Sequence, residues 1–430
     1  NPEGGIDLFL EKLVQETEKE HEDILEQADE TDAMFGELYS WYLRNPEYRS
    51  RVQKLVQSAF AGKPEDIISQ SVAKALYGEV SPYSATRLER FAACAFAHFL
   101  QYGMKLTERV EYEFKPMDMG NVMHEALESF AEEVRKRGMK WTELTEQERN
   151  EIADRCLDNI VADYGNTVLK SSARNEYMIE RTRRILRRTV WALQKQLEQG
   201  EFQPEGFEVT FGGGRIDRVD IMEDQNKVYV KVIDYKTGNT SFDLVYLYHG
   251  LQLQLMIYLD GALRVEQKKY PDKEIIPAGV FYYNIKDPMI QEKIDADVEA
   301  VSAGLMKELK MNGLAQADPE LVYRMDSSLG SIPVAFNKDG SFRKNSSVAD
   351  RTQFAVLGRY VRTKIEKIRS SILEGDAEVS PYELGKKNAC TYCPYMTVCG
   401  FDRRLSGYEF RRLKNFSDEE LWKAFDREAE

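Results

Sequence analysis

The sequence contains no run of about 18 apolar residues, which is the length that a helix needs to cross a membrane. No signal peptide precedes its first apolar segments either. It also lacks the G-x-x-x-x-G-K-[ST] loop that cradles nucleotide phosphates, so we do not expect this chain to hydrolyse ATP. The first two absences predict a cytoplasmic protein, and we expect no membrane among its partners.

Basic residues are fewer than acidic ones: the sequence has 59 Lys and Arg and 73 Asp and Glu, which gives a net charge of −14. This balance argues against nucleic-acid binding through overall charge, although it is compatible with a local basic groove. Two segments do concentrate basic residues: 181–195 (RTRRILRRTVWALQK) and 403–414 (RRLSGYEFRRLK). Each could contact phosphates, but the solvated face of an amphipathic helix explains such a segment more often.

Cysteine is scarce, with five residues in 430, yet three of them are clustered. Cys390, Cys393 and Cys399 have the spacing C-x2-C-x5-C, which allows three thiolates on one loop to converge on a metal centre. Cys94 is the candidate for a fourth ligand, which leaves Cys156 as a separate buried thiol. A disulfide is a weak explanation in a cytosolic chain, so zinc and an iron-sulfur cluster both remain open.

Two predicted strands, in RIDRVDIM (215–222) and KVYVKVIDYKTG (227–238), carry charged residues within apolar rows. Because alternate side chains share a face, one side of the second strand presents Val228, Val230, Val232, Asp234 and Lys236. In the first strand, Asp217 shares its face with Val219 and Ile221, whereas Asp220 shares the other face with Arg218. An Asp and a Lys at the end of a core-facing row are costly to bury unless they are paired or bind a metal.

Asp217 and Asp234 are therefore predicted to point inward from neighbouring strands, with Lys236 beside them. Such a pair suits a hard divalent cation, since Mg²⁺ typically takes one or two protein carboxylates and keeps its other positions for water and phosphate. A lysine there could orient the attacking water or stabilise charge on a phosphodiester. The alternative is a buried ion pair between Asp234 and Lys236, with Asp217 incidental.

The motifs G-x-I-D-R-V-D, I-D-Y-K-T-G and Q-x-x-x-Y resemble those of the RecB-like branch of the PD-(D/E)XK nuclease superfamily. The resemblance implies that Asp217 and Asp234 bind Mg²⁺ or Mn²⁺ and that Lys236 is the catalytic lysine. It also implies that Gln254 and Tyr258, which lie four apart on one helix face, complete the catalytic motif. The implied fold is α/β, with a central mixed sheet flanked by helices.

A helix is predicted over FKPMDMGNVMHEALESFAEEV (114–134), and His124 lies at the edge of its apolar stripe. That stripe consists of Met123, Ala126, Leu127, Phe130 and Val134. A lone His in this place is more often a core residue than a ligand. However, the G-x-x-x-H pattern ending at His124 resembles the His motif of RecB-like nucleases, which implies a metal ligand. Glu208 is either a further acid of the site or an exposed strand residue.

The spacing C-x(295)-C-x2-C-x5-C, from Cys94 to Cys399, is similar to the [4Fe-4S] signature of the AddB family of bacterial AddAB helicase-nucleases. This resemblance covers about residues 80–410 and implies a cluster that clamps the C-terminal loop to the helix bearing Cys94. The link through Gly212 to Gly214 is shorter than the resemblance predicts.

The expected organisation is a helical segment over 1–80 followed by the nuclease over 81–430. Within the latter we expect a core at about 118–290 and a cluster loop at 390–399. The first segment shows helical spacing at Leu8, Leu10, Leu13 and Val14, and again at Leu38, Trp41 and Tyr42; Ser81 to Ser84 is interpreted as a later helix start. Because the chain starts at Asn1 without an initiator Met, we expect it to be a piece of a longer polypeptide.

The AddB resemblance implies a Mg²⁺-dependent exonuclease that cuts the 5′-terminated single strand of DNA during double-strand break processing for recombination. It also implies an AddA-type helicase-nuclease subunit as the partner. One alternative is a stand-alone iron-sulfur 5′–3′ exonuclease of the same superfamily. Another is a catalytically silent clamp that binds DNA ends, which the presence of Asp217, Asp234 and Lys236 disfavours.

Overall fold

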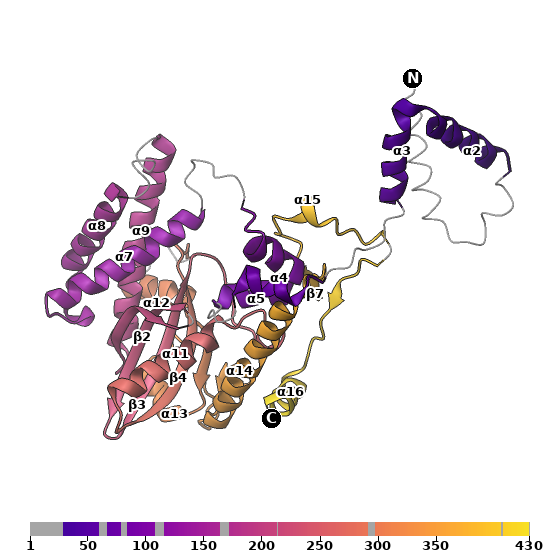
Figure 1. Cartoon of the computed structure of the whole chain (residues 1–430). Coiled ribbons are helices and arrows are strands. Elements are labelled where there is room, and N and C mark those ends of the chain that lie inside the picture. The colour runs from indigo at the N-terminus through magenta and orange to yellow at the C-terminus, as the bar shows by residue number, and fades with distance from the viewer. Residues whose placement is uncertain are drawn as a thin grey trace.

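The computed structural model describes residues 29–59, 67–78, 84–107, 116–163, 172–212, 214–290, 297–405 and 407–429 (Figure 1). The predicted helical positions Leu8, Leu10, Leu13 and Val14 lie outside this range, as does Ser81. Ser84 does begin a helix, because its side-chain oxygen accepts a hydrogen bond from the main-chain NH of Arg87.

The first described elements are α2 (Asp29–Arg44) and α3 (Pro46–Ala59), which pack on each other around Tyr42 and Val52. The next helix, α4 (Gln70–Tyr77), behaves differently, because its Ala73 and Tyr77 are buried in the core beside the central sheet. The helical segment expected over 1–80 is thus split, and α4 packs with the elements that follow it.

A six-stranded mixed sheet forms the centre of the molecule, with the spatial order β1-β2-β3-β4-β5-β6. Its strands are β1 (Gln203–Phe211), β2 (Gly214–Asp224), β3 (Lys227–Lys236), β4 (Glu274–Asn284), β5 (Asn312–Gln316) and β6 (Val348–Ala349). The pairs β1/β2, β2/β3 and β4/β5 are antiparallel, whereas β3/β4 and β5/β6 are parallel. The sheet therefore extends beyond the core expected at about 118–290.

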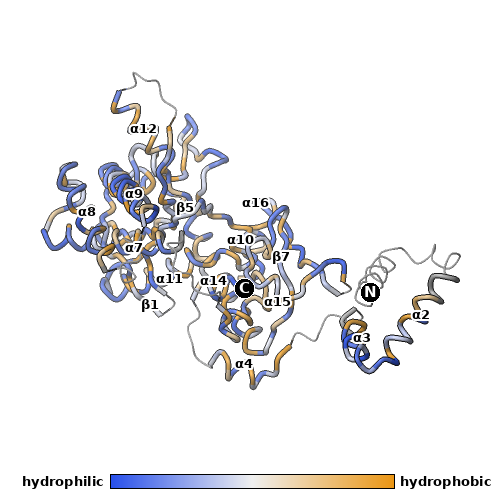
Figure 2. The backbone as a smooth tube through the Cα atoms, turned by 90° about the horizontal axis from the view of Figure 1, so that it is seen from above, coloured by the Kyte–Doolittle hydropathy of each residue, from blue (hydrophilic) through white to orange (hydrophobic). Residues whose placement is uncertain are grey.

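One face of the sheet is covered by a helical layer that is built mainly from α7, α8 and α9. This layer contains α7 (Pro116–Lys136), η2 (Trp141–Glu143), α8 (Glu146–Asp163), α9 (Ala173–Glu198), α12 (Val298–Glu308) and α13 (Pro319–Met325). Hydrophobic and hydrophilic residues alternate along α7 and α9 (Figure 2). The predicted apolar stripe of α7 is confirmed, since its five residues from Met123 to Val134 are all buried against this face.

The opposite face packs against a second helical layer and carries the alternate residues of the same strands. Val228, Val230 and Val232 point to this side, whereas Ile233 and Tyr235 point to the first. This layer contains α4, α5 (Ala85–Ala93), α10 (Leu244–Tyr248), α11 (Gln254–Lys269), α14 (Arg351–Glu374) and α16 (Asp418–Ala429). Because both faces are covered, charged residues on either side of β2 and β3 are buried.

A small three-stranded sheet holds the C-terminal cysteine loop, in the order β8-β7-β9. Its strands are β7 (Tyr382–Leu384), β8 (Lys387–Asn388) and β9 (Arg411–Arg412), and the short helix α15 (Met396–Cys399) lies in the loop between β8 and β9. The loop faces α6 (Ala95–His98) and η1 (Phe99–Gly103), which directly follow α5. The order of helices, three strands, helix and strand agrees with the expected α/β fold. None of the described helices is long and apolar enough to cross a membrane.

Candidate active site

Three carboxylates line up across three neighbouring strands at one end of the sheet. Phe207 pairs with Arg218 and Val209 with Ile216, so Glu208 of β1 lies opposite Asp217 of β2. The β2/β3 ladder ends with Arg218 opposite Ile233, and Asp217 and Asp234 are the next residues outward on the two strands. Directly opposed residues of antiparallel strands place their side chains on the same face. The main-chain NH of Tyr235 donates to Asp217 Oδ2 at 2.7 Å, which fixes this carboxylate at the point where the ladder opens.

Glu208 belongs to the site, so the exposed-strand alternative for this residue is wrong. A register shift between Pro204 and Gly206 precedes it, and Glu208 itself has a φ of 49°, in the left-handed region. This distortion turns its side chain inward, where it is only 7% exposed. There Glu208 Oε2 pairs with Arg215 Nε at 2.5 Å, while Oε1 faces His124 Nδ1 at 3.7 Å.

His124 reaches the carboxylates from α7 and lies 3.4 Å from Asp217 Oδ2. Gly120, one turn earlier, lets the helix approach β3 closely, since a Cβ there would lie 3.3 Å from Thr237 Oγ1. Burial lowers the pKa of His124, but hydrogen bonds to Asp217 and Glu208 and their negative charge outweigh this effect and raise it to about 10. Asp217 and Glu208 therefore favour a positive charge at this position, and a bound metal ion would take the place of the His124 proton.

On the other side of Asp217, a chain of contacts joins β3 to α11. Lys236 Nζ lies 2.7 Å from Asp234 Oδ2 and donates to Gln254 Oε1, also at 2.7 Å. Gln254 Nε2 in turn donates to Tyr258 OH at 2.9 Å. The structure thus brings together all five predicted catalytic residues. Burial and the charge of Asp217 raise the pKa of Asp234, against the opposing effect of Lys236. The ion pair that the alternative interpretation required exists, but Asp217 is not incidental to it.

Sequence reasoning missed Glu89, which approaches the same contacts from α5. Its Oε1 accepts hydrogen bonds from the main-chain NH groups of Leu253 at 2.7 Å and Gln254 at 3.0 Å. Burial raises the pKa of Glu89 to about 7, although these two hydrogen bonds and the charge of Lys236 oppose the shift. Glu89 therefore holds the first turn of α11, from which Gln254 reaches Lys236. In the sequence it is one more polar position on a short helix, and no local pattern points to its partner.

The donor set fits a hard divalent cation. One ligand atom each from His124, Glu208 and Asp217 lies within 4.8 Å of the other two, so the three groups can share one ion. Oxygen-rich sets of this kind suit Mg²⁺ or Mn²⁺. The predicted ligands His124 and Asp217 are in this group. Asp234 lies on the adjacent strand and is paired with Lys236, so its role as a ligand stays a prediction.

The four cysteines predicted to form one centre come together in space. Cys94 and Cys393 belong to one small cluster, and the charges of Cys94, Cys393 and Cys399 add to burial in raising the pKa of Cys390 to about 12. Thiols this close cannot all ionise unless a metal compensates their charge. Cys156 lies elsewhere, on α8 in the core of the first helical layer beside Ser129 of α7, as expected for the separate thiol.

Cys94 lies between α5 and α6 in extended backbone, and not inside a helix as expected. Main-chain and side-chain contacts fasten the C-terminal segment that holds the cysteine loop to the residues on both sides of Cys94. Tyr395 OH donates to the carbonyl of Leu106 at 3.0 Å, and the main-chain NH of Phe96 donates to the carbonyl of Glu378 at 3.0 Å. The guanidinium of Arg411 donates to the carbonyl of Ala92. These bonds join segments about 300 positions apart, so the cysteines are preorganised for a shared ligand.

The basic segment 181–195 forms part of α9 and is largely neutralised within the chain. Arg183 Nη2 lies 2.7 Å from Asp158, the Arg187 guanidinium pairs with Asp154, and Arg184 Nε lies 2.7 Å from Asp287 Oδ2. The solvated, ion-paired face of an amphipathic helix, rather than a phosphate track, therefore accounts for most of this segment.

Behind the row of carboxylates, on the opposite face of the sheet, lies a buried charged group. Asp220 is fully buried and accepts from Arg218 Nε at 2.6 Å and from Lys231 Nζ at 3.0 Å. The Arg218 guanidinium also lies over the rings of Trp141 and Phe207, 5.7 and 5.8 Å from their centroids. Asp220 thus points away from the site, as predicted, and helps to anchor the strands that carry Asp217 and Asp234.

The comparison with known families decides what this arrangement is. A sequence model of the PD-(D/E)XK nuclease superfamily matches residues 82–400, a span that runs from just before Cys94 to just after Cys399. The chain belongs to the PD-(D/E)XK nuclease superfamily. The predicted fold class is thereby confirmed, and every residue of the carboxylate site described above lies within the matched span.

The chain is also similar to proteins named as the AddB subunit of an ATP-dependent helicase/deoxyribonuclease, which confirms the resemblance to that family. The relative from Lachnoclostridium phytofermentans is 41% identical over 93% of this chain and 36% of its own length. Relatives from Thermoanaerobacter sp. and Clostridium acetobutylicum are each 33% identical over 93% of this chain, and over 37% and 36% of their lengths. The chain therefore spans little more than a third of the length of these curated relatives.

Proposed function

We propose that this PD-(D/E)XK chain is the nuclease region of an AddAB-type helicase-nuclease and cleaves single-stranded DNA with the help of Mg²⁺ or Mn²⁺. The observation that carries the proposal is the convergence of His124, Glu208 and Asp217 on one small volume, with Asp234 and Lys236 alongside. Superfamily membership and the deoxyribonuclease names of the relatives support it.

Each group of the site has a task in phosphodiester hydrolysis. His124, Glu208 and Asp217, with Asp234 as a further candidate, would hold the metal ion, which supplies Lewis-acid stabilisation of charge on the phosphate. Lys236 is oriented by Asp234 and Gln254 and can position a water molecule or donate to a phosphate oxygen. Tyr258 fixes the amide of Gln254 in turn.

We further propose that Cys94, Cys390, Cys393 and Cys399 hold a [4Fe-4S] cluster. The proposal is supported by the convergence of the four thiols at one place. It is also supported by the spacing C-x(295)-C-x2-C-x5-C, which is similar to the [4Fe-4S] signature of the AddB family. The competing occupant is a zinc ion, which the metal content of the purified protein distinguishes from a cluster.

The finer assignment rests on the relatives. Because each of them is named as one subunit of an ATP-dependent helicase/deoxyribonuclease, we propose an AddA-type partner that supplies the motor. In that assembly the substrate is the 5′-terminated strand of an unwound DNA end, processed for recombination. A stand-alone iron-sulfur exonuclease and a silent DNA-end clamp are the competing accounts.

The test is cleavage of end-labelled single-stranded DNA in Mg²⁺ by the complete protein and by an Asp234→Asn variant of equal iron content. Asp224→Asn is the matched control, because Asp224 lies at the far end of β2 and pairs with Arg324. The proposal predicts cutting by the wild type and the control but not by Asp234→Asn, and the labelled end reports polarity. DNA binding without cutting, even after an AddA-type partner is added, would support the clamp instead.

A further inference from the structure

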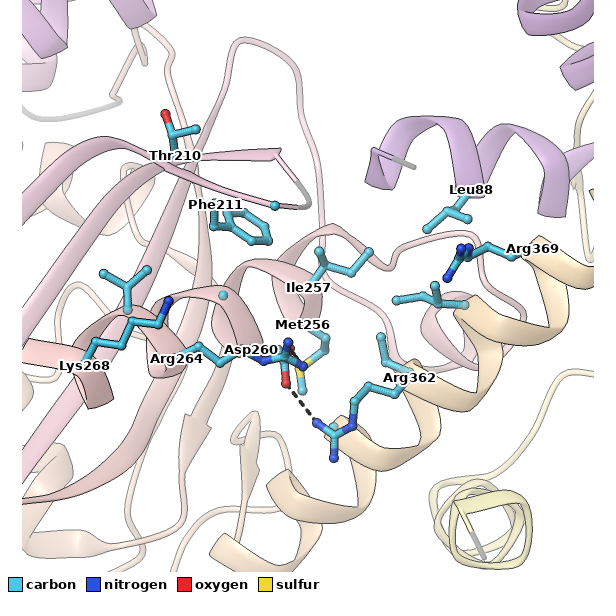
Figure 3. Close-up of a pocket in the computed structure, with 16 residues that line it drawn as sticks. Leu88, Thr210, Phe211, Met256, Ile257, Asp260, Arg264, Lys268, Arg362 and Arg369 are labelled. Carbon is cyan, nitrogen blue, oxygen red and sulfur yellow. Dashed lines mark hydrogen bonds and ion pairs between the residues drawn. The ribbon is translucent and has the colours of Figure 1, made fainter. Parts of the chain in front are cut away.

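A cavity of about 670 Å³ lies between α11, α14, α5 and the tip of β1 (Figure 3). Its floor is apolar and includes Leu88, Phe211, Met256 and Ile365. This cavity is separate from the cluster of carboxylates and contains no residue that the proposed chemistry uses. We call it the α11/α14 groove.

The rim of the α11/α14 groove is positively charged in a chain whose net charge is −14. Four cations line it, Arg264, Lys268, Arg362 and Arg369, and Asp260 is the one carboxylate among the lining residues. Arg369 Nη1 also pairs with Glu366 Oε1 at 2.9 Å, outside the lining. Asp260 is shared, lying 2.7 Å from Arg264 and 2.9 Å from Arg362, as the dashed line in Figure 3 shows for the second contact. Lys268 is exposed and has no ion-pair partner within the described residues. The groove is thus a local concentration of cations in an acidic protein.

The groove continues the catalytic face of α11. Gln254, Tyr258, Gly261, Val265 and Lys268 follow one another at intervals of four and three residues, which is the spacing of one helix face. The first two belong to the active site and the last three line the groove. From Gln254 to Lys268 this face is roughly 21 Å long at the usual rise of an α-helix.

Phe211, at the tip of the β1/β2 hairpin, marks where the site meets the groove. Its ring lies edge-on to Tyr258 at 5.9 Å and directly over Gly261, where a Cβ would come within 2.6 Å of the ring. Any side chain at position 261 would displace Phe211. The aromatic ring is therefore held between the catalytic residue Tyr258 and the basic part of the groove.

We propose that the α11/α14 groove binds several nucleotides of the single strand that the active site cuts, with its cations on the phosphates and Phe211 against a base. This inference rests on the proposed nuclease function and names where its substrate lies. Proteins that bind single strands without sequence preference combine a basic track with aromatic or apolar surface, and the groove has both. Its length accommodates several nucleotides, since a strand advances about 3.4 Å per nucleotide even when stacked in a duplex.

The test compares the complete protein with a Lys268→Gln/Arg362→Gln double variant. The matched control is Lys307→Gln/Lys367→Gln, which removes the same charge from exposed lysines on α12 and on α14 outside the groove. Binding of a 20-nucleotide single strand is measured by fluorescence anisotropy without divalent metal, over a range of salt concentrations. Cleavage is measured in Mg²⁺ on the same strand and on the p-nitrophenyl ester of thymidine 5′-monophosphate, which is too small to occupy the groove.

We expect the groove variant to bind the strand about tenfold more weakly, with a salt dependence reduced by about 1.4 because two phosphate contacts are lost. Its turnover of the small ester and the behaviour of the control should match the wild type. If the groove variant binds DNA as tightly as the wild type, the inference is overturned. If it binds DNA normally but no longer binds the AddA-type partner, the groove is a protein docking surface instead. If the wild type cuts neither substrate while the groove variant still binds DNA more weakly, the proposed catalysis fails and the groove assignment stands.

Discussion

Glu89 Oε1 accepts a hydrogen bond from the main-chain NH of Gln254 at 3.0 Å, although the two residues are 165 positions apart in the sequence. The contact joins α5, which ends beside Cys94, to the first turn of α11, which presents Gln254 to Lys236. The helix that directly precedes one predicted cluster ligand therefore also supports Gln254, the hydrogen-bond partner of the predicted catalytic lysine. Substitutions near the cysteine site are therefore expected to affect the residues around Lys236, and substitutions there to affect the cysteine site.

Loss of the Glu89 carboxylate should impair the chemical step. Glu89→Ala removes two hydrogen bonds from the start of α11, so we expect kcat for single-stranded DNA to fall about tenfold with KM and Mn²⁺ affinity unchanged. Glu89→Gln keeps an oxygen acceptor and should remain within about twofold of the wild type. Steady-state kinetics of the three proteins check this. A KM effect in Glu89→Ala, or equal damage in both variants, would show that Glu89 does not act by positioning α11.

Replacement of Asp220 should be strongly destabilising. Asp220→Asn leaves Arg218 and Lys231 buried without their counter-charge, and breaking a buried group of this kind costs about 3 to 5 kcal/mol. The free energy of unfolding in urea measures the loss. The exposed pair between Lys136 and Glu132 serves as a comparison, since Glu132→Gln should change stability by less than about 1 kcal/mol. Equal small effects would mean that the buried group contributes little.

Much of the site could be predicted because it depends on local alternation. The period of two in β3 correctly placed Val228, Val230 and Val232 on one face with Asp234 and Lys236 at its end. The spacing of four between Gln254 and Tyr258 likewise produced the observed contact. These relationships need only the regular geometry of one element, which short stretches of sequence specify.

The rest depends on distortion or on distant contacts. The side chain of Glu208 reaches the site because of a register shift and a left-handed φ. Neither feature can be predicted from the sequence pattern of β1. Glu89 meets α11 only because two helices pack across the chain. The segment 181–195 resembled a possible phosphate track because the carboxylates of α8 that neutralise it are about 30 positions away.

The pH dependence of stability should report on His98, a buried neighbour of Cys94. Burial, reinforced by the positive charge of Arg87, lowers its pKa to about 3, and Arg87 Nε donates to its Nε2 at 3.2 Å. The rings of Tyr77, Phe91 and Tyr102 enclose it. Because the folded-state pKa lies below the unfolded value of 6.5, the stabilisation is complete above pH 6.5 and is lost as the pH falls towards 3.

Unfolding in urea at pH 6 and pH 5 tests this expectation. His98→Gln keeps an acceptor for Arg87 but cannot titrate, so the wild type should lose about 1 kcal/mol more stability than the variant over this interval. Parallel pH profiles for the two proteins would show that His98 is readily protonated in the folded state.

Metal analysis should show which cysteines bind the metal centre and which metal they bind. The protein purified without oxygen should contain about four iron atoms per chain, and Cys94→Ser should lose them together with the visible absorbance of the cluster. Cys156→Ala is the control and should keep its iron, because Cys156 lies in the core between α8 and α7, away from the other four cysteines. About one zinc ion per chain in the wild type would instead support a zinc site, and iron retained by Cys94→Ser would remove this residue from the ligand set.

The most direct test of the nuclease account separates metal binding from catalysis at neighbouring positions. Mn²⁺ binding and cleavage of labelled single-stranded DNA are measured for the wild type, Asp217→Asn and Lys236→Met. The account predicts that Asp217→Asn loses both activities, because Asp217 lies with His124 and Glu208 at the metal position. Lys236→Met should bind Mn²⁺ like the wild type but cut at least about a hundredfold more slowly. A wild type that binds no Mn²⁺, or a Lys236→Met variant that cuts at the wild-type rate, would contradict it.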